Sequence, residues 1–267
     1  MPYIDTHAHF DLCIEEGTGV EEDLVAGLGM NGIYRAVHVT IDTGGFSWAL
    51  AFARRHADRG VLFTLGIHPS SKGDDGEFGK LERFTAGVME SDDAPLLFGI
   101  GEAGLDYYRM RQTKDAQIRS FERQIQLAKK WDLPIIVHSR DAAEESLALL
   151  GKYAPLRGIM HCFSEGSAMA RRFLDLGLHL SFAGNVTYRA ALPLQESAAY
   201  VPEDRLLLET DAPFLTPVPL RGKKNRPDYV VHTYAYVAEL RGTTREHLAG
   251  KIADNFKTLL PAGKDGD

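Results

Sequence analysis

Two histidines stand one residue apart near the start of the chain, in the segment Tyr3-Ile4-Asp5-Thr6-His7-Ala8-His9. The leading Tyr-Ile pair is typical of a β-strand, and side chains at positions i and i+2 of a strand point to the same side. We therefore expect the imidazoles of His7 and His9 to project together, as two ligands of a metal ion would. A His-x-His pair also arises readily by chance in a chain with 10 histidines, so its meaning depends on similar residues elsewhere.

Side chains of ligand type recur at the ends of later apolar segments. They are His68, Glu102, His138, His161, Glu209 and Asp211. An isolated histidine at a strand end is usually a polar residue that meets solvent, whereas several such ends in one chain favour a metal site. His38 lies inside a predicted strand without convergent partners, and we expect it to pack in the core.

A set of four histidines and two carboxylates suits Zn²⁺, Mn²⁺, Fe²⁺ or Mg²⁺ and does not single out one of them. Six ligands are too many for one catalytic ion that keeps a position open. Two ions that share a carboxylate fit better, and Glu102 is the natural bridge because its strand, the fourth, lies opposite the eighth. Paired ions stabilise both the attacking and the leaving oxygen of a phosphoryl displacement.

These residues need a repeated unit of strand and helix to position them. Short, β-rich apolar segments alternate with longer segments of helical periodicity, and most are too apolar for half-exposed strands. This pattern predicts an α/β fold, a single-domain (β/α)₈ TIM barrel over residues 1–260, with an open doubly wound sheet as the alternative. The eight predicted strands are Tyr3–His7, Ile33–Thr40, Val61–His68, Leu96–Glu102, Pro134–His138, Gly158–Cys162, Leu178–Gly184 and Leu206–Asp211.

Local signals predict several boundaries. Apolar residues at helical spacing indicate a helix within Thr113–Trp131. The segments Asp141-Ala142-Ala143-Glu144 and Thr243-Thr244-Arg245-Glu246 resemble capping boxes, which would begin the helix after the fifth strand and the last helix. Residues Ser70–Gly79, rich in Gly, Ser and Asp, predict a surface loop, and residues 261–267 a polar tail.

Composition excludes several classes of protein. The 267 residues carry a net charge of −7 with a pI of about 5.8, so any contact with phosphates needs a local cationic patch or metal ions. Two cysteines, Cys13 and Cys162, fit a reducing compartment better than a disulfide framework. No apolar run approaches the roughly 20 residues that span a bilayer, and no apolar leader precedes the first predicted strand. We expect a cytoplasmic protein with no membrane contact and no obligate protein partner.

Seven segments spread over nearly the whole chain carry a specific combined pattern. They are Ile4–Phe10, Gly66–Pro69, Gly99–Tyr108, Val137–Ala142, Met160–Ser164, Leu207–Leu215 and Pro217–Asn225. Together they resemble the TatD family of metal-dependent deoxyribonucleases in the amidohydrolase superfamily, although His-x-His alone is shared by the whole superfamily. The resemblance implies a TIM barrel with metal ligands at His7, His9, Glu102, His138, His161 and Asp211. In the family pattern His7, His9 and Asp211 hold one ion, His138 and His161 the other, and Glu102 bridges them.

The resemblance also implies cleavage of DNA phosphodiester bonds, in the manner of a 3′-end exonuclease and with single-stranded DNA as the expected substrate. Glu102, Asp211 and His68 are the expected catalytic residues, with Asp211 accepting a proton and His68 contacting a phosphate or protonating the leaving oxygen. Cations and aromatic rings on the predicted loops are expected to bind the strand. The predicted substrate-binding residues are Arg109, Arg140, Tyr108, Arg221 and Lys223, with Lys224, Tyr107 and Phe214 as further candidates.

Two other functions stay open from the sequence. The same pair of ions could hydrolyse a carboxylic ester or amide, as a D-aminoacyl-tRNA deacylase does, because an activated water and a Lewis acid serve both reactions. A barrel that only binds a ligand would be expected to lack some metal ligands, and none of the six is missing.

Overall fold

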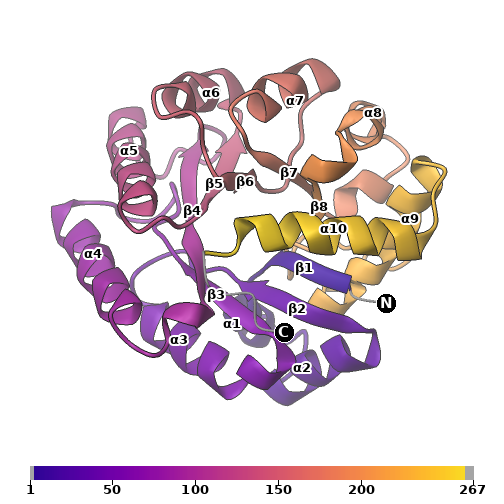
Figure 1. Ribbon diagram of the computed structural model, residues 1–267, viewed down its shortest axis with the longest axis horizontal. Helices are drawn as coiled ribbons and strands as arrows, with labels where there is room; N and C mark the ends of the chain where they lie inside the picture. The colour runs from indigo at the N-terminus through magenta and orange to yellow at the C-terminus, as the bar shows by residue number, and fades with distance from the viewer. Residues whose placement is uncertain (1–2, 262–267) are drawn as a thin grey trace.

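Eight parallel strands form a barrel in the computed structural model, which describes residues 3–261 (Figure 1). The strands pair in the order of the chain from the first to the eighth. This order confirms the predicted barrel and excludes the doubly wound sheet, in which the strand order reverses. The strands are β1 (Tyr3–Ala8), β2 (Ile33–His38), β3 (Val61–Leu65), β4 (Leu97–Asp106), β5 (Ile135–Arg140), β6 (Gly158–Met160), β7 (His179–Phe182) and β8 (Leu206–Leu208).

The barrel closes where the segment after β8 returns to β1. The backbone N–H of Asp211 donates to the carbonyl of His7 (3.0 Å), and the N–H of His9 donates to the carbonyl of Ala212 (2.8 Å). Ala8 and Ala212 form a parallel bridge between these contacts. The closure therefore brings the predicted ligands of the first and the last strand to one place.

Helices surround the barrel, as Figure 1 shows. The α-helices are α1 (Phe10–Glu15), α2 (Glu21–Met30), α3 (Phe46–Arg55), α4 (Asp75–Met89), α5 (Lys114–Lys130), α6 (Ala143–Gly151), α7 (Ser167–Leu174), α8 (Leu192–Tyr200), α9 (Val230–Leu240) and α10 (Arg245–Leu259). Short 3₁₀ turns are η1 (Ala57–Arg59), η2 (Ala94–Leu96), η3 (Gly184–Thr187), η4 (Glu203–Arg205) and η5 (Pro227–Tyr229). Strands β1, β3 and β4 are buried along their whole length, as expected for a parallel sheet covered by helices.

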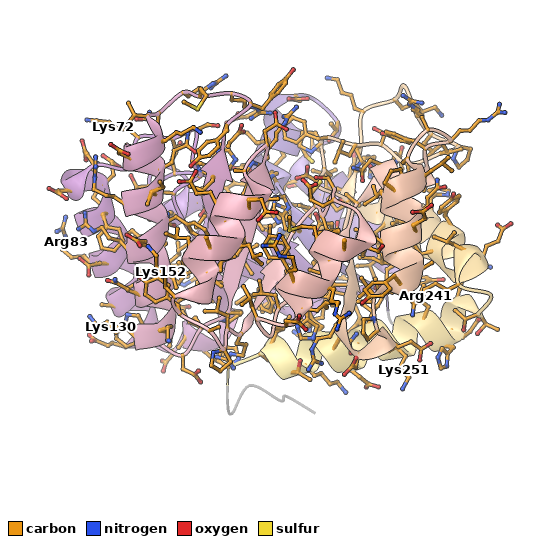
Figure 2. All side chains as sticks on the ribbon, turned by 90° about the horizontal axis from the view of Figure 1, so that it is seen from above. Lys72, Arg83, Lys130, Lys152, Arg241 and Lys251 are labelled. Atoms are coloured by element: carbon orange, nitrogen blue, oxygen red, sulfur yellow. The ribbon has the colours of Figure 1, made fainter. Side chains whose placement is uncertain are left out.

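Helix α10 crosses the N-terminal end of the barrel (Figure 1). The ring of Phe256 stacks on Phe98 near the start of β4 (centroids 4.8 Å apart), and the Asn255 amide donates to the carbonyl of Leu206, the first residue of β8. In Figure 2, Lys251 of α10 lies at the end of the molecule opposite Lys72, which belongs to the loop after β3. Since α10 covers one end, the loops at the other end remain to form a site.

Five strands end earlier than predicted: β2 ends at His38 instead of Thr40, β7 ends at Phe182 instead of Gly184, and three others are also shorter. β3, β6 and β8 end at Leu65, Met160 and Leu208, whereas the predicted ends were His68, Cys162 and Asp211. Cys162 (φ 44°) and Asp211 (φ 54°) have left-handed backbone, which cannot continue a strand. β4 instead runs on past Glu102 to Asp106, through a register shift between Ile100 and Ala103.

Both predicted capping boxes are wrong, for local reasons. Asp141 has a φ of 53°, and α6 begins at Ala143 without a side-chain cap, because an N-cap residue needs extended backbone. At α10 the capping residue is Thr244, whose hydroxyl accepts from the N–H of His247 (3.1 Å). Thr243 instead donates its N–H to Ala238 and closes the end of α9.

The predicted helix after β4 is confirmed as α5, capped by the Thr113 hydroxyl. The predicted loop Ser70–Gly79 is wrong in its second half, because α4 already begins at Asp75, with Asp74 accepting from the N–H of Glu77 (3.0 Å). The predicted tail 261–267 lies outside the described residues except for Pro261. Among residues 3–261, no helix is long and apolar enough to cross a membrane.

Candidate metal centre

All six predicted ligand residues meet at the open end of the barrel. Each lies in the second half of its strand or directly after it: His7 (β1), His9 (after β1), Glu102 (β4), His138 (β5), His161 (after β6) and Asp211 (after β8). Together with His68, their donor atoms form overlapping groups in the described part of the chain, and within each group every atom lies within 4.8 Å of the others. The groups are His7 with His9 and Asp211, His7 with Glu102 and His161, and His68 with Glu102 and His138. The barrel thus joins residues that are up to 204 positions apart in the sequence.

The first group joins the two ends of the barrel sheet and Glu102. Nε2 of His7 lies 3.3 Å from Nε2 of His9, and both nitrogens face Oδ1 of Asp211, at 3.8 and 3.5 Å. Oε2 of Glu102 lies 3.6 Å from the His7 nitrogen and 3.7 Å from the His9 nitrogen. A tetrahedral ion with bonds of about 2.1 Å spaces its ligands about 3.4 Å apart, so these four atoms fit a divalent cation.

The second group faces the other oxygen of the same carboxylate. Oε1 of Glu102 lies 2.6 Å from Nδ1 of His138 and 2.8 Å from Nε2 of His161. The two ring nitrogens are 3.2 Å apart. The two imidazoles and the carboxylate oxygen are of the types that bind a divalent cation, but the two contacts of Glu102 have hydrogen-bond length and would lengthen around a second ion. Glu102 therefore offers one oxygen to each group.

The backbone before Glu102 explains how a buried carboxylate reaches this position. Gly101 has a φ of 146°, and a Cβ atom there would lie 2.5 Å from the carbonyl oxygen of Ile136. A side chain would collide with β5, so only glycine allows β4 to approach this closely. Glu102 itself is almost completely buried.

Hydrogen bonds at two rings, and an ion-pair contact at a third, indicate which nitrogen of each ring is free for a metal. Nδ1 of His9 lies 2.8 Å from the carbonyl oxygen of Val39, which can only accept, so in the neutral ring, the form that binds a metal, the proton is on Nδ1 and Nε2 carries the lone pair. Nδ1 of His161 lies 3.1 Å from Oε1 of Glu209, with the same consequence. Nε2 of His138 faces Oδ2 of Asp106 at 3.5 Å, leaving Nδ1 for the centre.

His68 lies beside the second group, but the nitrogen that it turns toward Glu102 carries the proton, unlike the inner nitrogens of the three rings above. The N–H of Ser70 donates to its Nδ1 (2.9 Å), so the proton of the neutral ring is on Nε2. That nitrogen faces Oε1 of Glu102 at 3.6 Å. Burial lowers the pKa of His68 to about 3, which keeps the ring neutral. His68 is therefore arranged as a hydrogen-bond donor and differs from the three rings that present a lone pair.

The electrostatics of the centre are dominated by buried carboxylates. Burial favours the neutral form of Glu102, but the imidazoles of His161, His68 and His138 hold its pKa well below its usual value. Burial also opposes the charge on His9, yet the carboxylates of Asp211 and Glu102 raise its pKa to about 9. The pKa of His161 is raised well above its usual value by Glu102 and Glu209 against the effect of burial. The carboxylates thus stay anionic and attract cations.

Three supporting carboxylates were not recognised as such from the sequence. Glu209 accepts from the N–H of Cys162 (2.8 Å) as well as facing His161, and Asp106 accepts from the N–H of Arg109 (2.8 Å). Asp5 accepts from the hydroxyl (2.6 Å) and N–H (2.9 Å) of Thr210, which ties β1 to the segment that carries Asp211. Glu209 precedes Asp211 by two residues and Asp106 follows Glu102 by four, so the even spacing of acidic residues was the available signal.

Two of the predicted substrate-binding arginines lie on tyrosine rings. The guanidinium of Arg140, at the end of β5, lies 3.9 Å from the ring centroid of Tyr108. The guanidinium of Arg221 lies 4.3 Å from the ring centroid of Tyr188, a residue that the sequence analysis did not single out. Tyr188 directly follows η3, and no pattern in the neighbouring sequence indicated its contact with Arg221.

The other residues predicted to bind the substrate differ in what they contact within the protein. Arg109 stays close to Asp106 (Nε to Oδ2 3.9 Å), and the exposed Lys223 has its backbone fixed by Thr216 and Leu220. Lys224 instead binds the carbonyl of Glu16. Tyr107 donates to Glu145 (2.6 Å) beneath Lys114, which indicates packing.

Two further aromatic residues were given roles from the sequence: Phe214 as a candidate substrate contact and His38 as a core residue. Phe214 is partly exposed beside the ring of His9, with centroids 6.3 Å apart, so it borders the centre. His38 is fully buried, its Nδ1 accepts from the N–H of Phe10 (3.3 Å), and its ring lies against Trp48 and Phe52. The packing role expected for His38 is thus confirmed.

A parallel eight-stranded barrel with two adjoining groups of histidine and carboxylate donors at its open end defines a class of protein, the metal-dependent hydrolases. The chain belongs to the TatD family within that class, because the family model described as TatD related DNase matches residues 4–261.

Individual relatives agree with this assignment. The chain is 43% identical to the uncharacterized metal-dependent hydrolase YcfH of Escherichia coli (strain K12) over 204 residues, 75% of this chain and 74% of that protein. It is 36% identical to the uncharacterized metal-dependent hydrolase YabD of Bacillus subtilis (strain 168) over 258 residues, 96% and 98% of the two chains. The crystal structure of YjjV, a TatD homolog from Escherichia coli K12, superposes with a TM-score of 0.87 at 29% identity, covering 97% of each chain.

Proposed function

We propose that this chain is a phosphodiesterase that cleaves DNA and uses two divalent cations, Zn²⁺, Mn²⁺, Mg²⁺ or Fe²⁺. The observation that carries the proposal is the carboxylate of Glu102, whose two oxygens face two separate donor groups at 2.6 to 3.7 Å. His7, His9 and Asp211 would hold one cation, His138 and His161 the other, and Glu102 both. When bound, the two cations would activate a water molecule and stabilise charge on the phosphate oxygens.

Asp211 is placed to accept the proton of the attacking water. Burial raises the pKa of its carboxyl, but the imidazoles of His9, His161 and His7 outweigh burial and lower it. The carboxylate is therefore ionised near neutral pH and can act as a base. Its Oδ1 faces His7 and His9, so the base stands at the rim of the first donor group.

His68 would supply a hydrogen bond on the side of the second group. Its Nε2 carries the proton because Ser70 occupies Nδ1, and the ring is almost completely buried and held in place. This N–H can donate a hydrogen bond to a phosphate oxygen or to the leaving oxygen as the P–O bond breaks, whereas the neutral ring has no proton to transfer.

Local cations support a phosphodiester substrate in a protein whose net charge is −7. Arg140 and Arg221 are exposed arginines whose guanidinium groups lie on tyrosine rings, and Arg109, Tyr108 and Lys223 belong to the same set of loops. Guanidinium groups bind phosphate through paired hydrogen bonds. The description of the family as DNases agrees with this substrate class.

The test is a side-by-side assay of the metal-loaded protein with end-labelled single-stranded DNA, RNA and D-aminoacyl-tRNA. The proposal expects shortening of the DNA strand that depends on added divalent cation and stops with EDTA. Release of the amino acid without cleavage of either strand would contradict the proposal and favour an ester hydrolase that uses the same centre.

A further inference from the structure

Helix α5 carries two buried glutamines that bind backbone groups beside the metal centre. Gln117 and Gln124 are seven residues apart, about two turns of an α-helix, so both side chains lie on the same face. The helix packs against β4 (Figure 1). Gln117 is 1% exposed and Gln124 is fully buried, although glutamine is usually a surface residue. Two buried amides on one helix face need hydrogen-bond partners in the barrel.

Each amide pairs with one backbone residue as a neighbouring strand would. Oε1 of Gln124 accepts from the N–H of Ile67 (2.9 Å), and Nε2 of Gln124 donates to the carbonyl of the same residue (2.9 Å). Oε1 of Gln117 accepts from the N–H of Asp106 (2.8 Å), and Nε2 of Gln117 donates to the carbonyl of Asp106 (3.2 Å). Two bonds to one residue fix both its position and its direction.

A further hydrogen bond holds each amide in its orientation. Nε2 of Gln124 also donates to the hydroxyl of Ser120 (3.2 Å), and Nε2 of Gln117 also donates to the carbonyl of Gln112 (3.0 Å). Ser120 lies directly against the loop after β3, since a Cβ atom at Gly73 would be 2.8 Å from its Oγ. Both N–H groups of each amide thus have a partner, and the two amides are fixed on one helix.

The backbone residue that Gln124 binds directly precedes His68. Ile67 lies beyond the end of β3 at Leu65, so Gln124 continues the backbone pairing where the strand has stopped. Nε2 of the His68 ring faces Oε1 of Glu102 at 3.6 Å. A shift of Ile67 would therefore move the ring that is arranged as a hydrogen-bond donor at the centre.

The backbone residue that Gln117 binds carries the carboxylate beside His138. Oδ2 of Asp106 lies 3.5 Å from Nε2 of His138, and Oδ1 accepts from the N–H groups of Tyr108 (3.1 Å) and Arg109 (2.8 Å). Asp106 is buried, and its contact with His138 leaves Nδ1 of that ring for the second donor group. Gln117 thus reaches the second donor group through Asp106.

We propose that α5 is a positioning helix with two separate tasks: Gln124 places His68 for catalysis, and Gln117 places Asp106 and His138 for the second cation. The inference rests on the proposed phosphodiesterase function and assigns it two positioning residues, each of which acts through another residue. A purely structural role would give the two substitutions the same effect. Separate tasks predict two different losses, because a catalytic donor and a metal ligand fail in different ways when they are displaced.

The test replaces each glutamine with methionine, which has a similar length but no amide. Gln124→Met should bind Mn²⁺ as the wild type does and lose about 10- to 100-fold in kcat on single-stranded DNA. Gln117→Met should bind the second Mn²⁺ about 10-fold more weakly, and excess Mn²⁺ should restore its kcat. Gln126→Met, at an exposed position of the same helix, is the matched control and should keep the wild-type kcat and affinity.

Double variants show whether each glutamine acts through its proposed partner. In a protein that already carries His68→Gln, adding Gln124→Met should change kcat by less than about twofold. In a protein that carries Asp106→Asn, adding Gln117→Met should change the affinity for Mn²⁺ by less than about twofold. Ile125→Ala, at a fully buried position of α5, loses stability without losing these bonds and should keep both values while it is folded.

Circular dichroism checks that every variant is folded. Where a methionine variant does not fold, asparagine, which is one methylene group shorter than glutamine, is measured at the same position.

Two results would overturn the inference while the proposed function stands. One is the same loss of kcat and of metal affinity in Gln124→Met and Gln117→Met, and the other is a full additional loss in either double variant. If metal-loaded wild type cleaves no DNA, the proposed function is contradicted, and the Mn²⁺ titration decides the inference by itself. A wild-type affinity in Gln117→Met would then overturn it, and a 10-fold weaker one would support it.

Discussion

The carboxylate of Glu209 faces Nδ1 of His161 at 3.1 Å and accepts the N–H of Cys162 at 2.8 Å. Glu209 is fully buried, and its hydrogen-bonded contact with the centre is through this ring. The contact places the proton of His161 on the outer nitrogen and turns the inner one toward Glu102. A residue that touches no proposed ion therefore prepares one of its ligands.

Replacing Glu209 with glutamine should weaken metal binding without removing a ligand. The amide keeps the shape but loses the charge that fixes the tautomer, and we expect about a 10- to 100-fold loss of metal affinity. Titration with Mn²⁺ or Zn²⁺ against a competing chelator measures the change, with the exposed Glu90→Gln as control. Wild-type affinity in Glu209→Gln would show that the tautomer is fixed by something else.

The variant His68→Gln should lose catalysis and keep its metals. Because the lone pair of His68 is on the nitrogen turned toward Ser70, we expect an unchanged metal content and about a 10²-fold or greater fall in kcat. Elemental analysis together with kinetics on single-stranded DNA checks both points. Loss of one ion from this variant, as expected for His138→Ala, would make His68 a ligand and contradict the assigned role.

The stability of the barrel depends on a hydrogen-bonded tyrosine behind β1. The buried hydroxyl of Tyr234 accepts from the N–H of Ile4 (3.2 Å) and donates to its carbonyl (3.1 Å). Tyr234→Phe leaves both backbone groups without this partner and should lower the free energy of unfolding by about 1–3 kcal/mol. Urea denaturation tests this, with Tyr236→Phe expected to change the value by less than about 0.5 kcal/mol. Equal stability of the two variants would count against the role of Tyr234.

Acid should destabilise the protein partly through His179, at the start of β7. Burial, helped by Arg205, lowers the pKa of His179 to about 4 from the usual 6.5. Between these values the unfolded chain binds the additional proton, so stability is lost as the pH falls from 6.5 toward 4. The contribution is about 2 kcal/mol between pH 7 and pH 5.

The measurement is urea denaturation of wild type and His179→Leu at both pH values. The variant should lose about 2 kcal/mol less than the wild type over this interval. Ionisation at the metal centre cancels in the comparison because His179 begins its strand at the opposite end of the barrel. Parallel pH curves for the two proteins would show that His179 is not the group concerned.

The sequence was informative where a rule of local geometry applied. Strand ends in a parallel barrel converge, so His7, Glu102 and His138 could be brought together before any coordinates were known. Helix starts were less predictable, because the φ of Asp141 depends on how β5 leaves the barrel. The strand positions indicated Glu102 as the bridging carboxylate, but no sequence rule indicated the close approach of Gly101 to Ile136 that brings it to the centre.

The supporting contacts were harder to predict than the ligands. Glu209 meets His161, and Asp106 meets His138, across strands that only the closed barrel makes neighbours. The pairing of Tyr188 with Arg221 joins two loops whose paths depend on the bond from Tyr188 to Thr216. Such contacts follow from tertiary packing, which local sequence patterns do not determine.

The central claim is that Glu102 joins two metal ions in one hydrolytic centre. The most direct test is the metal content and DNA hydrolysis of Glu102→Ala after loading with Mn²⁺ or Zn²⁺ and gel filtration, beside wild type and the exposed Glu82→Ala. We predict two ions per chain in wild type and Glu82→Ala. In Glu102→Ala we predict fewer than two ions and no measurable hydrolysis, with an unchanged circular dichroism spectrum. Two ions still bound to Glu102→Ala with undiminished hydrolysis would contradict the account.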